Sequence, residues 1–413
     1  MIKFDRFTLD NGLRVIVHKD NSTPLACVNI LYDVGARDED ENRTGFAHLF
    51  EHLMFGGSVN IPSYDEPLQR VGGENNAFTS NDITNYYLTL PAENLETAMW
   101  LESDRMLSLA FSEKSLEVQR NVVIEEFKQR YLNQPYGDVW LLVRPLAYKV
   151  HPYRWATIGK EISHIEDAVM DDVKAFFKKF YTPNNAVLVV AGAVDTEQVK
   201  ALAKKWFEPI SSEEKYVRDL PAEPRQEEYR SETVERDVPF DAVYLNFHMC
   251  ARHDPEYPAM DLISDILSRG NSARLYNRLV KEERMFSELN AFVMGDSDKG
   301  TFVVSGKLNE GISTQQAEDA VFAELKKLQD EPVSDRELQK VKNKVESTLL
   351  FAEMGILDKA MNLAFYELMG DANMINTELG EYMKVTAEEI QAVAKEVFRK
   401  TNCSTLHYKK KMN

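Results

Sequence analysis

Cysteine, histidine and positive charge are all scarce in this 413-residue sequence. The three cysteines, Cys27, Cys250 and Cys403, lie far apart and include no Cys-x-x-Cys pair, which argues against a disulfide framework or a thiolate metal site. Asp and Glu number 67 against 49 Lys and Arg, giving a net charge of −18. A phosphate-binding surface needs an excess of Lys and Arg, so we expect no nucleic-acid partner. The charge is compatible with a neutral or basic peptide ligand, or it serves only for solubility.

Long apolar runs are absent as well. The longest, residues 186–194, is far shorter than the roughly 20 residues that a bilayer-spanning helix needs. Residues 1–15 do not have the charged, then apolar, then small pattern of a signal peptide. We therefore expect no membrane association and a cytoplasmic location in which the thiols stay reduced.

The remaining composition, 44% hydrophobic and 28% charged, is that of an ordinary globular protein. The chain is too long for one hydrophobic core, which favours two or three domains. Hydrophobic periodicity and turn residues predict a series of strands and helices along the chain. Strands are predicted at 7–17, 25–34, 77–90 (one or two strands), 185–192 and 242–249, and helices at 46–55, 62–71, 95–109, 112–131, 173–180, 196–206 and 257–267.

A polar stretch at residues 208–236 divides the chain. It mixes Ser, Glu, Lys and Arg with three prolines and has little apolar content, which is typical of a surface linker between domains. An irregular excursion within one domain is the alternative. We predict a first domain at 1–212, a linker at 213–236 and a related second domain, without the metal motif described below, at 237–413.

The second half of the sequence repeats features of the first. In both halves a strand is followed by a polar loop and an amphipathic helix, and the apolar positions of 47–54 match those of 260–267. The pattern indicates a duplicated unit that kept its packing, although amphipathic helices also align by chance. In this alignment the polar residues differ: Asp261, Ser264 and Asp265 stand where the first half has His48, Glu51 and His52.

The segment His48-Leu49-Phe50-Glu51-His52 predicts a metal site. Residues four apart lie on the same face of a helix, so His48 and His52 can bind one zinc ion through their imidazole nitrogens. Glu51 lies beside the pair, where its carboxylate can take a proton from the attacking water. Such a five-residue pattern also arises by chance, and the alternative is a pair of ordinary helix histidines. Its position on an amphipathic helix between Gly45 and Gly56 favours the inverted form of the HExxH zinc motif.

A peptidase site needs a third protein ligand, usually a carboxylate or an imidazole. Glu125 and Glu126 are the candidates, and they point in different directions because successive helical residues are rotated by about 100°. Glu125 shares its stripe with mostly polar residues, whereas Glu126 shares its stripe with Val122 and Val123. A ligand has to face the interior, so we predict Glu126. The alternative for both residues is a solvated acidic pair.

Several segments now make a specific resemblance. The chain resembles the inverzincin group of zinc peptidases, the pitrilysin/insulinase family, in its mitochondrial-processing-peptidase-like branch. The resemblance covers nearly the whole chain and places Glu126 at the position of the third metal ligand. The segments that carry it are Gly-Phe-Ala-His-Leu-Phe-Glu-His-Leu-Met-Phe at 45–55, Gly-Gly-Glu-Asn-Asn-Ala-Phe-Thr at 72–79, Arg-Asn-Val-Val-Ile-Glu-Glu at 120–126, His-Pro-Tyr at 151–153, and 181–192.

The resemblance implies an α+β fold of two similar domains. Each would be an antiparallel sheet packed against helices, and the two would face each other around a chamber. It further implies one Zn²⁺ ion and short or unfolded peptide substrates. The residues expected to bind the substrate backbone as an added strand are Asn76, Ala77, Phe78 and Thr79.

The sequence departs from the family pattern at two places. Gln119 stands where the family often has a further Glu, seven residues before the third ligand. This difference affects the residues that surround the metal ligands and not the ligands themselves. In the second half, Val280 or Lys281, and Ser287, stand where an Arg and a Tyr that contact the substrate are expected. We therefore predict a partner chain, a non-catalytic relative that supplies the Arg/Tyr pair, with a homodimer as the next choice.

Two further functions are compatible with such a fold. A non-catalytic structural or chaperone-like subunit would have no use for His48, Glu51, His52 and Glu126 together. A metal-binding regulatory module would not require Glu51. The complete set favours a zinc metalloendopeptidase, the catalytic subunit of a dimer.

Overall fold

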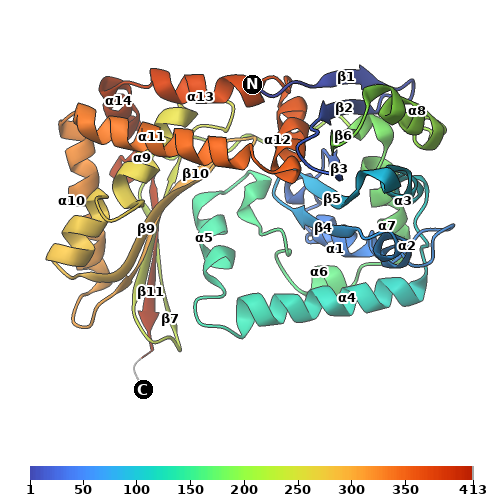
Figure 1. Cartoon of the computed structure of the whole chain (residues 1–413). Coiled ribbons are helices and arrows are strands. Elements are labelled where there is room, and N and C mark those ends of the chain that lie inside the picture. Colours follow the sequence, from blue (N-terminus) through green and yellow to red (C-terminus); the bar gives the residue numbers. More distant parts are fainter. Residues whose placement is uncertain (412–413) are drawn as a thin grey trace. The chain divides into compact units, whose positions relative to one another are not determined.

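A computed structural model describes residues 1–411, which divide into two compact units (Figure 1). Unit 1 comprises residues 1–128, 155–220 and 349–377, and unit 2 comprises 129–154, 221–348 and the described residues from 378 onward. Each unit is one β-sheet covered by helices, so the predicted α+β fold class is confirmed. The chamber that the resemblance implies concerns the placement of one unit against the other and stays a prediction.

Unit 1 contains a six-stranded sheet in the order β1-β2-β6-β3-β5-β4. Neighbouring strands are antiparallel except β2 and β6, which are parallel. Every residue of β6 is buried, as its unbroken run of apolar residues predicts. The strands are β1 (Asp5–Thr8), β2 (Arg14–Lys19), β3 (Leu25–Tyr32), β4 (Glu74–Thr79), β5 (Thr84–Pro91) and β6 (Ala186–Gly192).

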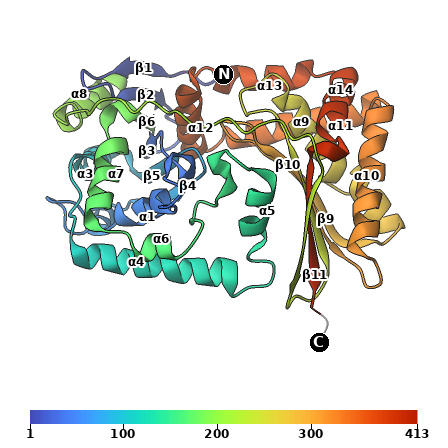
Figure 2. The same ribbon diagram turned by 180° about the vertical axis from the view of Figure 1, so that it is seen from behind.

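Helices cover both faces of this sheet, as Figures 1 and 2 show from opposite sides. On one face, Leu363 of α12 packs in a cluster with Leu31 of β3 and Val189 of β6. On the other side, α3 lies against β3 and β5, and α1 lies beside β4 and α7. The helices of unit 1 are α1 (Phe46–Leu53), α2 (Asp65–Arg70), α3 (Leu95–Leu107), α4 (Glu113–Phe127), α6 (Ser163–Glu166), α7 (Met170–Phe180), α8 (Thr196–Trp206) and α12 (Ile356–Met369).

Unit 2 contains a five-stranded sheet in the order β7-β11-β8-β10-β9, antiparallel except for the pair β7 and β11. On one face, Val143 of α5 packs with Leu406 and Tyr408 of β11. The strands are β7 (Arg230–Arg236), β8 (Ala242–His248), β9 (Phe286–Met294), β10 (Thr301–Leu308) and β11 (Cys403–Lys410). The helices are α5 (Val139–Ala147), α9 (Tyr257–Ser268), α10 (Thr314–Asp330), α11 (Asp335–Ala352) and α14 (Ala387–Val397); α11 and α13 (Met374–Lys384) each cross a unit boundary.

The two sheets have the same topology. Strands β2, β6, β3, β5 and β4 of unit 1 occur in the same order as β7, β11, β8, β10 and β9 of unit 2. In both units a strand is followed by the helix of the proposed repeat, α1 in the first and α9 in the second, and then by two antiparallel strands. The parallel pair occupies the same place in each. The repeat suggested by the sequence is therefore present in the strand order.

Two helices belong to the unit built mainly from the other half of the sequence. Residues 129–154, which carry α5, belong to unit 2, and residues 349–377, which carry α12, belong to unit 1. The two compact units therefore differ from the predicted domains 1–212 and 237–413. The boundaries of those domains stay a prediction. Periodicity in the sequence is local and gives no information on which sheet a helix covers.

The predicted linker, residues 213–236, has no regular structure up to residue 229, and its last seven residues form β7. This strand was not predicted, because its residues are mostly exposed and show no apolar alternation. Other predicted elements agree with the structure to within a few residues, and the predicted helix at 196–206 has the bounds of α8.

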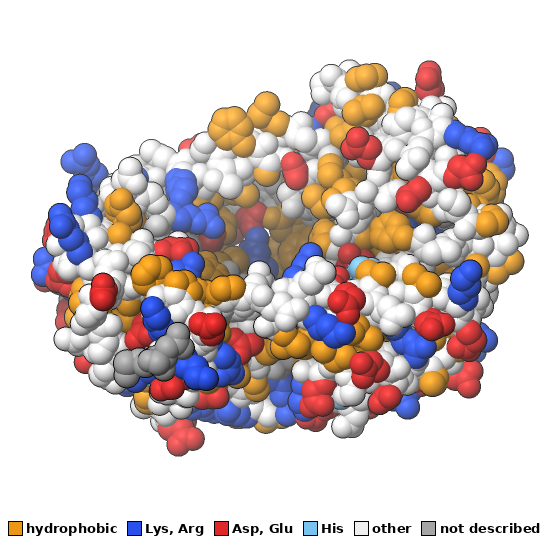
Figure 3. All heavy atoms as spheres, turned by 90° about the horizontal axis from the view of Figure 1, so that it is seen from below, with side chains coloured by type: hydrophobic (Ala, Val, Ile, Leu, Met, Phe, Trp, Pro, Cys, Tyr) orange, Lys and Arg blue, Asp and Glu red, His pale blue; other side chains and the backbone are white. Residues whose placement is uncertain are grey.

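The described residues include no helix long and apolar enough to cross a bilayer. On the face drawn in Figure 3, acidic and basic side chains are interspersed. The net charge of −18 is therefore not gathered into one acidic field on that face.

Candidate metal centre

The histidine motif lies on α1, whose two faces differ in burial. The apolar face is buried, and its Phe50 ring stacks on Phe176 of α7 with the ring centroids 4.8 Å apart. His48, Glu51 and His52 lie on the opposite, half-buried face. The spacing of apolar residues thus orients the helix, and the polar residues of the motif are left facing away from the core.

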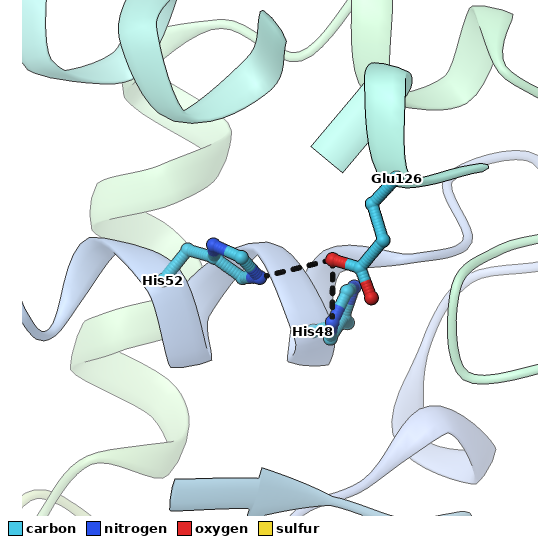
Figure 4. A group of neighbouring side chains, drawn as sticks. All are labelled: His48, His52 and Glu126. Atoms are coloured by element: carbon cyan, nitrogen blue, oxygen red, sulfur yellow. Dashed lines mark ion pairs between the residues drawn. The ribbon is translucent and has the colours of Figure 1, made fainter. Parts of the chain in front are cut away.

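Glu126 of α4 meets the two histidines, as Figure 4 shows. Its Oε2 lies 3.6 Å from Nε2 of His48 and 3.4 Å from Nε2 of His52. The two imidazole rings are perpendicular, with their centroids 4.9 Å apart. Within residues 1–411 this is the one group of three or more His, Cys, Asp or Glu side chains close enough to bind a metal ion together.

The distances fit a zinc ion. Two atoms bound to one tetrahedral zinc at about 2.0–2.1 Å lie about 3.3–3.4 Å apart, close to the separations of Oε2 of Glu126 from the two Nε2 atoms. Two imidazoles and one carboxylate are a donor set that catalytic zinc sites use, with a fourth position left open. The three side chains are 13%, 24% and 17% exposed for His48, His52 and Glu126, so the group is reachable from solvent.

The position of Glu126 depends on how α4 is fixed. Ser112 caps the start of α4 by accepting a hydrogen bond from the Ser115 amide, and Arg120 donates to the carbonyl oxygens of Glu166 and Ala168. Glu126 then faces α1, whereas the exposed Glu125 pairs with Lys128 at 2.7 Å. Gln119 lies two turns before Glu126 on the same stripe and is half-buried.

Glu51 accepts a hydrogen bond from a neighbouring strand. The Thr79 hydroxyl donates to Oε2 of Glu51 at 2.5 Å. No local pattern in the sequence predicts this contact, because the two residues belong to different elements. The hydrogen bond fixes one carboxylate oxygen beside the histidine pair and connects the helix to β4.

The four predicted substrate-binding residues lie on β4, the last strand of the six-stranded sheet. Side chains alternate along this strand between exposed and half-buried, and Phe78 is 40% exposed. The amide of Ala77 donates to the Asn76 side chain, at 2.8 Å. A strand at the edge of a sheet has one row of backbone groups available to an extended peptide.

Glu39 is a buried acidic residue that the sequence did not single out. Its carboxylate accepts hydrogen bonds from the amides of Gly45 and Ala47, at the start of α1. Burial raises the pKa of Glu39 to about 8, and these two hydrogen bonds oppose the rise. Glu39 lies in a polar loop of the sequence, where burial is not expected. Gly45 precedes the helix and has no side chain to cap it, so the sequence does indicate that a cap must come from another residue.

The residues that stand where an Arg/Tyr pair is expected lie in unit 2. Val280 and Lys281 belong to a π-helical segment, Tyr276–Glu282, and Ser287 lies on β9. The Ser287 hydroxyl donates to the carbonyl oxygen of Lys307 at 3.2 Å.

Two family models match the sequence of this chain. Residues 14–138 match the family described as Insulinase (Peptidase family M16), and residues 167–345 match the Peptidase M16 inactive domain. The chain is 30% identical to "Zinc protease PqqE" of Helicobacter pylori over 413 residues, which cover 98% of this chain and 93% of that protein. It is also 26% identical to an Arabidopsis thaliana protein named "Probable mitochondrial-processing peptidase subunit beta, mitochondrial", over 83% of this chain and 66% of that protein.

A solved structure of a protease is also similar to this chain. The crystal structure of a protease from Helicobacter pylori matches with a TM-score of 0.94 and 30% identity, over 99% of this chain and all of that one. The chain therefore belongs to the insulinase family of peptidases, and the predicted family is confirmed. The relatives named zinc proteases agree with zinc as the metal of this family.

Proposed function

We propose that this chain is a zinc metalloendopeptidase in which His48, His52 and Glu126 bind one zinc ion and Glu51 is the general base. The observation that carries the proposal is the convergence of the three side chains, with Oε2 of Glu126 at separations from the two Nε2 atoms that suit tetrahedral zinc. A bound zinc ion would polarise the scissile carbonyl and make water more acidic.

The residues of the chain supply the proton transfers. Glu51 lies on the same half-buried face as the histidines but outside the group of candidate ligands, and its carboxylate would take a proton from the attacking water. The same carboxyl group can then give that proton to the leaving amine. The hydrogen bond from Thr79 keeps the carboxylate in one orientation, which favours both transfers.

The substrate we propose is a short or unfolded polypeptide. An extended peptide would add to the free edge of β4 along Asn76, Ala77, Phe78 and Thr79, with its backbone hydrogen-bonded to the strand. Thr79 is both on this edge and bonded to Glu51, so a peptide added here would lie beside the base.

We further propose a partner chain and a cytoplasmic location. Unit 2 has Val280, Lys281 and Ser287 where an Arg/Tyr pair is expected, so a non-catalytic relative, or a second copy of this chain, would complete the substrate site. The likeness to a processing-peptidase β subunit supports a two-chain enzyme. Full turnover by a monomeric chain would contradict this part of the proposal.

A non-catalytic subunit on the same fold is the second candidate function. The match of residues 167–345 to a domain described as inactive favours it. That match lies outside the segments that carry His48, Glu51, His52 and Glu126, so it is also compatible with one active and one inactive half.

The substitution Glu51→Gln separates the two functions. Glutamine has the same shape but cannot accept the proton, so we expect the variant to keep bound zinc and to lose peptide turnover by at least about 100-fold. Zinc content and cleavage of an unfolded fluorogenic peptide are measured on the same preparations. Glu125→Gln, on the exposed side of α4, is the matched control and should change neither. Turnover by Glu51→Gln at the wild-type rate would exclude Glu51 as the general base. If the wild-type chain cleaves no peptide even when its partner chain is present, the non-catalytic subunit is favoured.

A further inference from the structure

The helix that carries the histidines begins without a capping side chain of its own. The residue before α1 is Gly45, with a φ of 89°, and it has no side chain that could accept a hydrogen bond from the first amides. The first amides of any α-helix have no partner inside the helix and need one elsewhere when they are buried. Gly45 and Ala47 are both buried.

Glu39 supplies the missing partners. One carboxylate oxygen accepts from the Gly45 amide at 2.9 Å, and the other accepts from the Ala47 amide at 2.8 Å. A carboxylate at this end of a helix also interacts favourably with the helix dipole. Glu39 is itself buried, so its oxygens have little access to water that could compete for these hydrogen bonds.

The hydrogen bonds act on the turn that carries His48. Ala47 is the preceding residue, and α1 has only eight residues, so its first turn is a large part of the helix. Helices this short are not stable alone and take their conformation from tertiary contacts. The orientation of the His48 ring toward Glu126 therefore depends on how the Gly45 and Ala47 amides are bonded.

Glu39 is in turn fixed by a segment connected to the substrate strand. Just before Glu39, the Ala36 amide donates to the Ser80 carbonyl oxygen at 3.1 Å, and the Arg37 amide donates to that of Asn81 at 2.9 Å. Ser80 and Asn81 directly follow β4. The Trp155 indole N–H also donates to the Ala36 carbonyl oxygen at 2.8 Å. Segment 36–39 thus joins the end of β4 to the start of α1.

We propose that Glu39 is a positioning residue that sets the first turn of α1 and thereby the affinity of the His48, His52 and Glu126 group for zinc. This inference rests on the proposed function, because it assumes that these three side chains bind the ion. Glu39 acts through the two amides and touches neither the ion nor the substrate.

The test compares Glu39→Gln and Glu39→Ala with the wild-type full-length chain. Zinc affinity is measured by competition with a chelator at one pH for all three proteins. We expect zinc binding to weaken about 10- to 100-fold, as is usual when a residue that orients a metal ligand is lost. The amide exchange of residues 44–49 is measured without metal and should become faster in both variants, since one or both acceptors are gone.

Two controls separate positioning from general destabilisation. Glu41→Gln changes a more exposed acid two residues away, which pairs with Lys160, and should leave zinc affinity and exchange unchanged. Leu245→Ala removes buried volume from unit 2 and lowers stability without touching α1. Should Glu39→Ala not fold, the isosteric Glu39→Gln carries the test alone.

Zinc affinity within about twofold of wild type in Glu39→Gln, together with unchanged exchange at residues 44–49, would overturn the inference and leave the proposed function intact. Failure of the wild-type chain to bind zinc would contradict the proposed function instead. The exchange measurement needs no metal, so it still decides whether Glu39 fixes the first turn of α1.

Discussion

Thr79 lies on the edge strand β4 and donates its hydroxyl hydrogen to Glu51. The sequence resemblance assigned it to the substrate alone. In the structure, the hydrogen bond to Glu51 gives it a second part in the site. A hydrogen bond to a charged group contributes about 1.5–3 kcal/mol, enough to decide which way the carboxylate points.

Thr79→Val tests this contact, since valine keeps the shape of the side chain and removes the hydroxyl. We expect peptide turnover to fall roughly 10- to 100-fold, the equivalent of about 1.5–3 kcal/mol, with zinc content unchanged. Thr79→Ser retains a hydroxyl and should keep most of the rate. Equal rates for Thr79→Val and wild type, measured on the same peptide, would show that the hydrogen bond is dispensable.

At this scale the sequence predicted what depends on spacing along one helix. The interval of four residues placed His48 and His52 on one face, and the stripe analysis of α4 preferred Glu126 to Glu125. In the structure these three side chains meet. The contacts of Glu51 with Thr79, and of Glu39 with Gly45, join separate elements. They depend on the tertiary fold, and no local pattern predicts them.

At the scale of helices and strands, no element was predicted beyond residue 267, and α12 shows what was missed there. It lies far along the second half of the chain, yet Ala360, Leu363 and Ala364 pack against the sheet of unit 1. An amphipathic pattern in a helix indicates a buried face, but it does not show which sheet covers that face. β7 was missed for a different reason, since its exposed, polar residues have no apolar alternation.

Leu363→Ala tests the assignment of α12 to unit 1. The side chain is fully buried, so its removal leaves a cavity and should lower the free energy of unfolding of unit 1 by about 2–5 kcal/mol. Amide exchange should become faster in β3 and β6 and stay unchanged in β8 and β10, which belong to unit 2. Faster exchange confined to β8 and β10 would mean that α12 stabilises the other unit.

At the scale of the whole molecule, the two units have the same strand order and different chemistry. Unit 1 carries His48, Glu51 and His52 on α1, while the aligned positions on α9 are Asp261, Ser264 and Asp265. Packing in a duplicated fold needs only the apolar stripe of the helix, so the polar positions are free to change. The sequence alignment of the two halves predicted this relationship, and the common strand order supports it.

The central claim is that three side chains from two helices bind a single ion. It is tested most directly by anomalous diffraction at the zinc absorption edge from crystals of the full chain grown with zinc. We predict one strong peak at about 2.0–2.2 Å from Nε2 of His48, Nε2 of His52 and a carboxylate oxygen of Glu126. A peak elsewhere, or a peak at the histidines with the Glu126 carboxylate beyond bonding distance, would contradict the account.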